Sequence, residues 1–423
     1  MLYGNIKKKK NNLKLTISHI ISLCKGVFHG NSTEFTATHI SIDSRSLQNG
    51  NNTLFFAIKG QNHDAHLYLE ELIAKGVRYF VVEYIPEHVY EKANFIIVEN
   101  SLKALQQTAI GYRKQFDFPF IGITGSNGKT IVKEWLNFLL SPNHLIVRNP
   151  KSYNSQVGVP LSILAIEGNY DLGIFEAGIS LPNEMSNLEN IIQPKYGILT
   201  NIGSVHDEGF ANREAKIKEK IKLFENCSDI FLEKNAEIEV LLTQNSQIHT
   251  WSFTDESANL FVSKKNENGK TELTFKNATN TFSVNIPFSD ENSIENVITC
   301  VNFMLFLGEE IAFIQNRVAE LYPVELRLQA KKGINNCLVI DDSYSVDYQS
   351  LKIALDFLEQ QKLHEKKTII LSDIFTSGIA VETLYNQVKQ LLSKNKIERI
   401  ITIGETIGKQ LNDLPNVISF ATT

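Results

Sequence analysis

A glycine-rich turn between a buried strand and a helix constrains this sequence more than any other feature. The run 118–123 (FPFIGI) has no charged or polar side chain, as is typical of a strand covered on both faces of a parallel sheet. The segment Thr124–Thr130 (TGSNGKT) follows, and 131–140 has the pattern of a helix, with Pro142 beyond its end. A strand, a glycine turn and a helix in this order predict a phosphate-binding loop.

The composition of this turn suits a nucleoside triphosphate. Glycines let the backbone fold tightly, so that successive N–H groups point at phosphate oxygens beside the positive end of a helix. Lys129 supplies a full charge to the outer phosphates, and the Thr130 hydroxyl can hold Mg²⁺. We therefore assign ATP binding to Gly125, Ser126, Asn127, Gly128, Lys129 and Thr130.

The turn departs from the general Walker form GxxxxGK[ST], which would need a glycine where Ile123 stands. It has the shorter form GxxGKT. An ordinary glycine loop between a strand and a helix is the alternative interpretation. The Gly-Lys-Thr sequence after a buried strand and at the start of a helix favours phosphate binding.

The length of 423 residues predicts two or three domains. The net charge of −5 gives no sign of a nucleic-acid partner, and no apolar run reaches the ~18 residues needed for insertion into a membrane. The four cysteines are widely spaced and form no CxxC pair, so we expect reduced thiols rather than a zinc site. These features indicate a cytoplasmic protein.

Alternating strand and helix patterns predict an α/β fold in three regions. We place a small N-terminal α/β domain at 1–112, a central P-loop domain with a parallel sheet at 113–318, and a doubly wound C-terminal domain at 319–423. An amphipathic helix is expected at 13–24, and a β-hairpin within 258–288. Other strands are expected at 53–58, 79–83, 172–175, 196–200, 337–340, 368–371, 399–403 and 417–420, and other helices at 67–76, 213–226, 294–307, 350–360 and 381–393.

Polar side chains follow two of the expected central strands. Glu176 directly follows the strand 172–175, and His206 comes shortly after the strand 196–200. Ligands of open α/β sheets collect at the carboxyl ends of the strands, so Glu176 is our first candidate for a Mg²⁺ ligand. The next helix carries a lysine at every second position from 216 to 222, and this spacing alone indicates a solvated basic face.

The compact form TG[ST]NGK[ST] of the loop resembles that of the Mur ligases, and further segments match this family in order over nearly the whole chain. The resemblance implies an N-terminal domain that binds a nucleotide sugar, a central ATPase domain and a Rossmann-like C-terminal domain that closes over the site. It also implies an ATP-dependent ligase that activates a carboxylate as an acyl phosphate, with ATP and Mg²⁺ as cofactors.

The N-terminal match consists of three short segments, Asp43-Ser44-Arg45, Lys59-Gly60 and Asp64-Ala65-His66. The resemblance implies that they hold the uridine diphosphate part of a substrate, and an arginine fork matches phosphate oxygens. Taken alone, the first segment favours a surface ion pair between its aspartate and its arginine, whereas the ordered set of matches favours substrate binding. The resemblance assigns substrate binding here to Ser44, Arg45, Lys59, Asp64 and His66.

Two central positions take metal-binding roles from the resemblance. His206 matches the family's metal-binding histidine, and Lys220 matches a lysine that CO₂ carbamylates. The carbamate is an anion that would hold a second Mg²⁺, and its formation needs a lysine pKa lowered by burial or by a neighbouring charge. The implied metal ligands are Thr130, Glu176, His206 and Lys220, and the implied catalytic residues are Lys129, His206 and carbamylated Lys220.

Other matches concern the nucleotide and the acceptor. Asn154 lies in an asparagine-rich segment that the resemblance places at the acceptor end of the nucleotide substrate. The resemblance implies an adenine contact for Asn296, a ribose contact for Asp342 and a position near the nucleotide for Arg327. Asn292 stands where the family has a histidine, and a helix N-cap is its alternative role. The segments 344–348 and 372–378 also depart from the family pattern, so we expect different contacts to the acceptor.

Within the family, the sequence most resembles the ligases that join UDP-muramoyl tripeptide to D-alanyl-D-alanine in peptidoglycan synthesis. A ligase that adds the third amino acid would carry an Asp-Asn-Pro-Arg-like motif, which is absent, and a folylpolyglutamate synthase would lack the segment 43–45. A non-catalytic nucleotide-sugar-binding module of a fused enzyme remains an alternative. No basic Lys-Gly-Ser-Arg-like segment precedes Thr423, so a truncated chain, or the ligase part of a fusion to an alanine racemase domain, is also compatible with the sequence.

Overall fold

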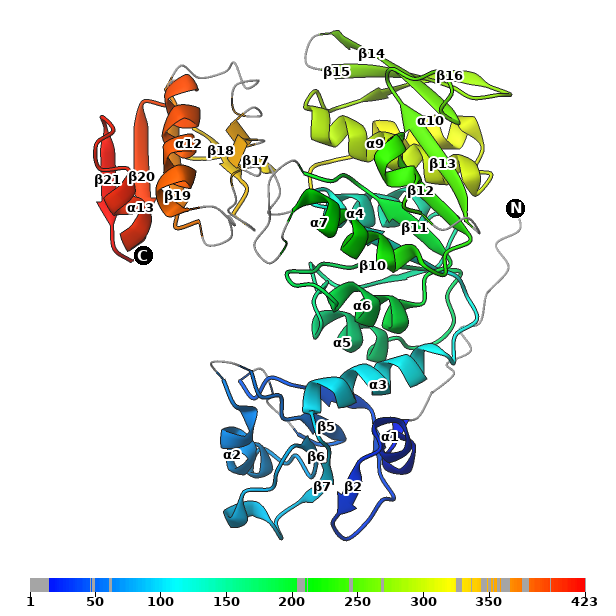
Figure 1. Ribbon diagram of the computed structural model, residues 1–423, viewed down its shortest axis with the longest axis vertical. Helices are drawn as coiled ribbons and strands as arrows, with labels where there is room; N and C mark the ends of the chain where they lie inside the picture. The colour runs from blue at the N-terminus through cyan, green and yellow to red at the C-terminus, as the bar shows by residue number, and fades with distance from the viewer. Residues whose placement is uncertain are drawn as a thin grey trace.

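The computed structural model describes residues 15–422 apart from 46, 48–49, 61–62, 204–209, 211, 243–245, 268–269, 325–328, 336, 344–347, 349–350, 353, 356–357, 359–365, 375–379 and 396. These residues form an α/β fold with an N-terminal, a central and a C-terminal domain (Figure 1). The exact boundaries at 112/113 and 318/319 stay predictions. Among the described residues, every helix is too short or too polar to span a bilayer.

The N-terminal domain is built on a five-stranded sheet in the order β2-β7-β6-β5-β4. β5 and β6 are buried at every residue, because helices cover a largely parallel sheet on both faces. The helix expected at 13–24 is α1, and the helix expected at 67–76 is the 3₁₀ turn η1 followed by α2. The elements are β1 (Leu15–Thr16), α1 (Ile17–Cys24), β2 (Val27–His29), β3 (Thr36–Ala37), β4 (His39–Ser41), β5 (Thr53–Phe56), η1 (Ala65–Tyr68), α2 (Leu69–Ala74), β6 (Tyr79–Val82), η2 (Glu87–Val89), β7 (Asn94–Ile97) and α3 (Ser101–Arg113).

The central domain holds a nine-stranded sheet in the order β16-β15-β14-β13-β12-β11-β8-β10-β9. The strands from β9 to β14 along this order are parallel, and β15 and β16 continue it as antiparallel neighbours. The elements are β8 (Phe120–Thr124), α4 (Lys129–Leu140), β9 (Ile146–Arg148), α5 (Gly158–Leu164), β10 (Leu172–Glu176), α6 (Glu184–Ile192), β11 (Tyr196–Leu199), α7 (Arg213–Ile221), η3 (Lys222–Phe224), β12 (Asp229–Glu233), α8 (Ala236–Glu239), β13 (Gln247–Ser252), β14 (Leu260–Glu267), β15 (Lys270–Lys276), β16 (Thr281–Ile286), α9 (Glu291–Phe306) and α10 (Ile311–Ala319).

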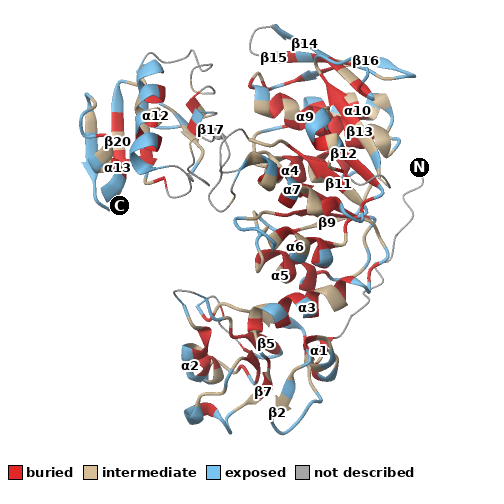
Figure 2. Ribbon diagram, in the orientation of Figure 1, coloured by how far each residue is buried: buried red, intermediate tan, exposed pale blue. Residues whose placement is uncertain are grey.

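The alternation of side chains along β8 explains the layers around this sheet. Ile121 and Ile123 point into a core that they share with α4 and α9. Phe120 points the opposite way, into a core formed with α3, α5, α6 and η3 that continues into the N-terminal domain. Both faces of β8 are therefore covered, and all its residues are buried. Figure 2 shows the buried colour on the neighbouring part of the sheet, around β11 and β12.

β8 also lies where the chain order of the sheet reverses. β10 and β9 lie on one side of it, and β11 to β16 lie on the other. Ligands of open α/β sheets bind at the carboxyl ends of the strands beside such a reversal. The topology therefore predicts a ligand site among the residues that follow β8, β10 and β11.

The C-terminal domain stands to the side of the central domain in Figure 1 and has an apolar core of its own. A two-stranded antiparallel unit, β17 (Gln329–Lys332) and β18 (Leu338–Asp341), leads into the parallel sheet β19-β20-β21. The expected strands here are confirmed within one residue at each end. The remaining elements are β19 (Thr368–Ser372), α12 (Val381–Lys394), β20 (Arg399–Ile403), α13 (Glu405–Gln410) and β21 (Val417–Phe420). The helix expected at 350–360 falls largely outside the described residues.

Candidate active site

The loop that joins β8 to α4 has a backbone that only glycine accepts at two positions. Gly125 has a φ of +149° and Gly128 a φ of +81°. A Cβ added at Gly125 would lie 2.0 Å from Thr200 Oγ1, and one at Gly128 would lie 2.3 Å from Asn296 Oδ1. The two glycines thus combine a tight turn with close packing against α9 and the residue that follows β11. The sequence pattern predicted the tight turn but not the packing.

The residues after β11 hold the loop from the side. The main-chain N–H of Ser126 donates to the Asn201 carbonyl at 2.9 Å, and that of Asn127 donates to Asn201 Oδ1 at 3.0 Å. Ser126 Oγ in turn accepts from the N–H of Gly203 at 2.9 Å. Asn201 has no recognisable motif in the sequence, and its position shortly after a predicted strand is the one signal for its role. It is a loop-positioning residue in this geometry.

Two lysines from different helices converge on one loop carbonyl. Lys129 Nζ donates to the carbonyls of Gly125 and Ser126 at 2.9 and 3.1 Å. Lys220 Nζ, from α7, donates to the Gly125 carbonyl at 3.1 Å. Positive charge therefore gathers at the place where the sequence predicts the phosphates of a nucleotide.

The lysines of α7 divide between two environments. Lys216 and Lys220 are 1% and 4% exposed, so the interpretation of their spacing as a solvated face is wrong for these two. It holds for Lys218, whose side chain is 56% exposed and pairs with Glu214. Period-two spacing in a helix places neighbouring lysines on different faces, and α7 packs one of these faces toward the loop.

Oxygen ligands of the kind that Mg²⁺ prefers gather beside the loop. Thr130 Oγ1 donates to Glu176 Oε2 at 2.7 Å and lies 3.0 Å from Ser152 Oγ. Glu176 is fully buried, and its Oε1 atom has no hydrogen-bond partner among the described residues. A buried carboxylate oxygen left without a donor is costly unless a cation or its water satisfies it. These residues fit Mg²⁺, which binds through one or two protein oxygens and keeps the rest for water and phosphate.

Asn149 is a second residue that the sequence analysis missed. Its side chain is fully buried and bridges to the end of β10, since Oδ1 accepts from the Glu176 N–H and Nδ2 donates to the Glu176 carbonyl, both at 3.1 Å. The main-chain carbonyl of Asn154, the predicted substrate residue of the same segment, accepts a hydrogen bond from the Gly178 N–H at 2.9 Å. The segment that precedes α5 therefore lies along the carboxyl end of β10.

The nucleotide residues expected outside the loop, taken together with the expected metal ligand His206, have three outcomes. Asn296 is 4% exposed on α9, and its side chain contacts the position of Gly128, so it lies at the loop. Asp342 directly follows β18 and so belongs to the C-terminal domain. His206 and Arg327 lie outside the described residues.

The N-cap interpretation of Asn292 is wrong, because Asp290 is the N-cap of α9 and accepts from the N–H of Ser293.

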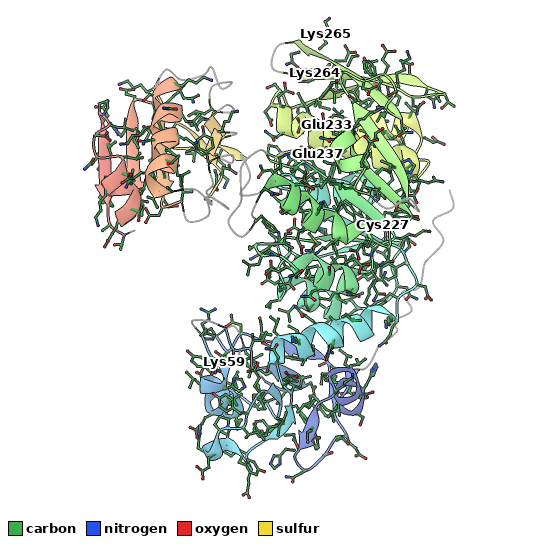
Figure 3. The ribbon with its side chains drawn as sticks, viewed as in Figure 1. Lys59, Cys227, Glu233, Glu237, Lys264 and Lys265 are labelled. Carbon is green, nitrogen blue, oxygen red and sulfur yellow. The ribbon has the colours of Figure 1, made fainter. Side chains whose placement is uncertain are left out.

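Glu295, the residue before Asn296, should make the free energy of unfolding depend on pH. Burial, reinforced by the like charges of Glu233 and Glu291, raises the pKa of Glu295 to about 7. Figure 3 labels Glu233 on this part of the central domain, together with Lys264, whose charge opposes the rise. The ionised form is thus disfavoured in the folded state, so stability is complete below the unfolded pKa near 4.5 and is lost as the pH rises through about 7.

We expect Glu295→Gln to raise the free energy of unfolding by about 1–2 kcal/mol at pH 8.5, a value that allows for partial solvation of the carboxylate. At pH 4.5 the two proteins should differ by less than about 0.5 kcal/mol, because both side chains are then largely neutral. Urea titrations at the two pH values measure the difference. An equal gain at both would mean that packing, rather than charge, causes the effect.

The predicted substrate residues of the N-terminal domain form two groups. Arg45 pairs with Asp43 at 3.0 Å and its side chain is 89% exposed, so the surface ion pair is present and the guanidinium is open to solvent. Ser44 is buried, and its carbonyl accepts from Lys75 Nζ at 2.9 Å. The loop after β4 therefore presents Arg45 and encloses Ser44.

The second group surrounds Asp64. His66 is buried and its Nε2 accepts from the Glu83 N–H at 2.9 Å, so Nδ1 carries the proton and donates to Asp64 at 2.6 Å. Lys59, labelled in Figure 3, lies 3.9 Å from the other oxygen of Asp64 and is half exposed. Burial raises the pKa of Asp64, but the hydrogen bonds from His66 outweigh it and the net shift is downward. His66 is placed to hold Asp64, and Lys59 is the member that faces solvent.

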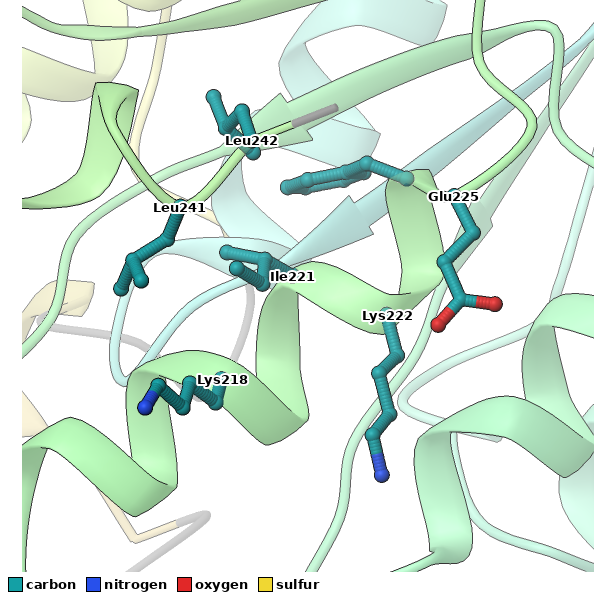
Figure 4. A pocket seen from close by; sticks show the side chains of 7 residues that line it. Lys218, Ile221, Lys222, Glu225, Leu241 and Leu242 are labelled. Carbon is teal, nitrogen blue, oxygen red and sulfur yellow. The ribbon is translucent and has the colours of Figure 1, made fainter. Parts of the chain in front are cut away.

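A pocket elsewhere in the central domain contains none of the predicted site residues. It lies between α7, η3 and the chain after α8, with Ile221, Phe224, Leu241 and Leu242 as its apolar lining (Figure 4). Lys218, Lys222 and Glu225 complete its lining. The chemistry described above lies instead at the carboxyl ends of β8, β10 and β11.

Comparison with known proteins gives a consistent picture. A model of the Mur ligase middle domain matches residues 123–304. A UDP-N-acetylmuramoyl-tripeptide–D-alanyl-D-alanine ligase from Borreliella burgdorferi is 30% identical over 419 residues, which cover 93% of this chain and 88% of that protein.

Solved structures support the fold over the same length. A MurF crystal structure from Acinetobacter baumannii has a TM-score of 0.82 at 22% identity and covers 97% of this chain and 90% of its own. A MurF ligase from Thermotoga maritima in complex with ADP has a TM-score of 0.74 at 21% identity and covers 90% of this chain and 87% of its own. At these identities the likeness concerns the arrangement of the domains.

Proposed function

Because the chain belongs to the Mur ligase family of ATP-dependent peptide ligases, we propose that it joins UDP-N-acetylmuramoyl-tripeptide to D-alanyl-D-alanine in peptidoglycan synthesis. The observation that carries the proposal is the convergence of Lys129, Thr130 and Glu176 at the carboxyl ends of β8 and β10. The relative with 30% identity, whose name states this reaction, supports the choice of substrates.

The reaction that suits this site has two steps. In the first, a carboxylate oxygen of the tripeptide bonds to the γ-phosphorus as the bond to the ADP oxygen breaks, which gives an acyl phosphate and ADP. In the second, the amine of D-alanyl-D-alanine bonds to the acyl carbon, phosphate leaves, and the amine gives up a proton. Neither step changes an oxidation state, and ATP supplies the driving force.

The chain's residues would act on the phosphates. Lys129 would exchange its bonds to the loop carbonyls for bonds to phosphate oxygens, and the loop N–H groups would bind the same oxygens. Thr130 and Glu176, with His206 and carbamylated Lys220, would hold Mg²⁺. Bound Mg²⁺ would neutralise the charge that develops on the transferred phosphoryl group. Closure of the C-terminal domain, which carries Asp342, would keep water away from the acyl phosphate.

We further propose that CO₂ carbamylates Lys220. Its burial and its bond to the Gly125 carbonyl place Nζ at the phosphate loop, where an added carboxylate would serve as a metal ligand. With ¹³C-bicarbonate, we expect one carbamate carbon resonance in the wild-type protein that disappears in Lys220→Arg. The same variant should lose at least about a hundredfold in kcat/KM. Lys218→Arg, on the exposed face of α7, should keep both the resonance and the activity, and a resonance that persists in Lys220→Arg would assign the carbamate elsewhere.

An ADP-release assay tests the proposed reaction. With UDP-muramoyl tripeptide and ATP, D-alanyl-D-alanine should stimulate ADP release and yield a pentapeptide product, whereas single amino acids should not. Stimulation by a single amino acid or by glutamate on a folate would favour another amide ligase of this family. No ADP release with any acceptor, combined with binding of the nucleotide sugar, would favour a non-catalytic module.

A further inference from the structure

A buried lysine, Lys133, lies one helical turn beyond Lys129 on α4. It is 0% exposed, and its Nζ donates to the Asn149 carbonyl at 2.8 Å and also to the Lys151 carbonyl. Glu134 Oε1 lies 3.2 Å from the same nitrogen. A fully buried ammonium group is costly to desolvate, and these three oxygens offset that cost. What the lysine holds is therefore the backbone of the segment 149–151.

This segment is connected to the predicted metal ligands at both ends. Asn149 clamps the main chain of Glu176 through two hydrogen bonds, and Ser152 Oγ lies 3.0 Å from Thr130 Oγ1. Thr130 Oγ1 closes the ring by donating to Glu176 Oε2. The contacts thus run from α4 through 149–152 to the end of β10 and back to α4, and Lys133 holds the part of the ring that has no regular secondary structure.

The charges around Lys133 agree with this arrangement. Burial lowers its pKa, while the carboxylates of Glu176 and Glu134 act in the opposite direction. Glu134 is in turn held by Arg148 Nε at 3.0 Å. Lys133 therefore compensates part of the negative charge of Glu176 as well as holding the neighbouring backbone.

We propose that Lys133 is a positioning residue that fixes the segment 149–152, so that the hydroxyls of Thr130 and Ser152 and the carboxylate of Glu176 are held ready for the magnesium–nucleotide complex. The inference rests on the proposed function, because it requires such a complex to bind at this loop. Without the ammonium group, the carbonyls of Asn149 and Lys151 lose their donor and the segment relaxes. The loss should therefore fall on the metal-dependent part of nucleotide binding.

Calorimetric titration with a non-hydrolysable ATP analogue, in Mg²⁺ and in EDTA, separates the metal-dependent part of nucleotide binding from the metal-independent part. We expect Lys133→Met to weaken binding in Mg²⁺ by about tenfold or more, the range seen when a residue behind a metal ligand is lost. Binding in EDTA should change by less than about twofold. Lys133→Gln retains an uncharged amide N–H₂ as donor and should weaken binding in Mg²⁺ by about threefold, and it decides the question if Lys133→Met does not fold.

Arg113→Met is the matched control. Arg113 is 7% exposed, and its guanidinium donates to the carbonyls of Ile192 and Phe116, both at 2.8 Å, and neither carbonyl belongs to the loop 125–130 or to the segment 149–152. Its loss should lower the unfolding temperature, as the loss of any buried cation that holds main-chain carbonyls does, but should leave the effect of Mg²⁺ on nucleotide binding unchanged.

The outcomes distinguish the inference from the proposed function. Wild-type dependence on Mg²⁺ in Lys133→Met or Lys133→Gln overturns the positioning role, and so does an equal loss in Arg113→Met. Absence of any Mg²⁺-dependent binding in the wild-type protein contradicts the proposed function itself. A selective loss in the Lys133 variants, with wild-type affinity in EDTA, supports the positioning role.

Discussion

Lys129→Ala should lower the rate of ATP-dependent ADP release about a thousandfold, which corresponds to roughly 4 kcal/mol of lost transition-state stabilisation. In the structure its Nζ atom donates to two loop carbonyls, so the ammonium group lies at the place where the sequence and the topology predict the outer phosphates. Alanine removes the positive charge that Lys129, the first residue of α4, directs at the loop. The assay is ADP release with saturating acceptor and UDP-muramoyl tripeptide.

Two further measurements make this result specific. The unfolding temperature of Lys129→Ala should stay within a few degrees of the wild type, because the lost side chain is only partly buried and its hydrogen bonds to Gly125 and Ser126 stay within the loop itself. Lys103→Ala, an exposed lysine on α3, should have wild-type activity. Near-normal ADP release by Lys129→Ala would contradict the assignment of the phosphate loop.

The strand, glycine turn and helix of the proposed phosphate loop could be predicted from the sequence because their signals are local. A buried strand, two glycines and a helix start lie within a dozen residues, and the structure places β8, the loop and α4 there. The place of Glu176 at the end of β10 could also be predicted, because a carboxylate that follows an apolar run marks the end of a buried strand, whereas its role as a Mg²⁺ ligand stays a proposal. Each of these inferences uses only the order of residues within one element and its neighbours.

Residues that work through tertiary contacts could not be found in this way. Lys133 has the spacing of an ordinary helix lysine, and only the segment 149–151 packed against α4 explains its burial. Asn201 holds the loop because β11 is the neighbour of β8, which the strand order of a sheet decides and a single sequence does not state. The burial of Lys220 likewise depends on which face of α7 turns toward the loop.

Glu176→Gln should separate function from stability, because we propose that the carboxylate binds a cation rather than supporting the fold. Glu176 is fully buried, and its Oε1 has no partner among the described residues, whereas Oε2 accepts from Thr130. Glutamine keeps the size of the side chain and an acceptor for Thr130, but it removes the charge that would hold Mg²⁺. We expect kcat/KM for ADP release to fall by at least about a hundredfold.

The free energy of unfolding in EDTA should change little or rise by about 1 kcal/mol in the same variant, since a buried charge that a ligand would satisfy destabilises the protein without it. Adding Mg²⁺ with a non-hydrolysable ATP analogue should raise the unfolding temperature of the wild type and have a much smaller effect on Glu176→Gln. Glu184→Gln provides a control, because its carboxylate bonds to the main chain of Ser180 and Leu181 on the surface and should leave activity intact. If Glu176→Gln lost stability in EDTA as well as activity, the carboxylate would be a structural acceptor, and the magnesium site would have to be sought at other oxygens of the loop.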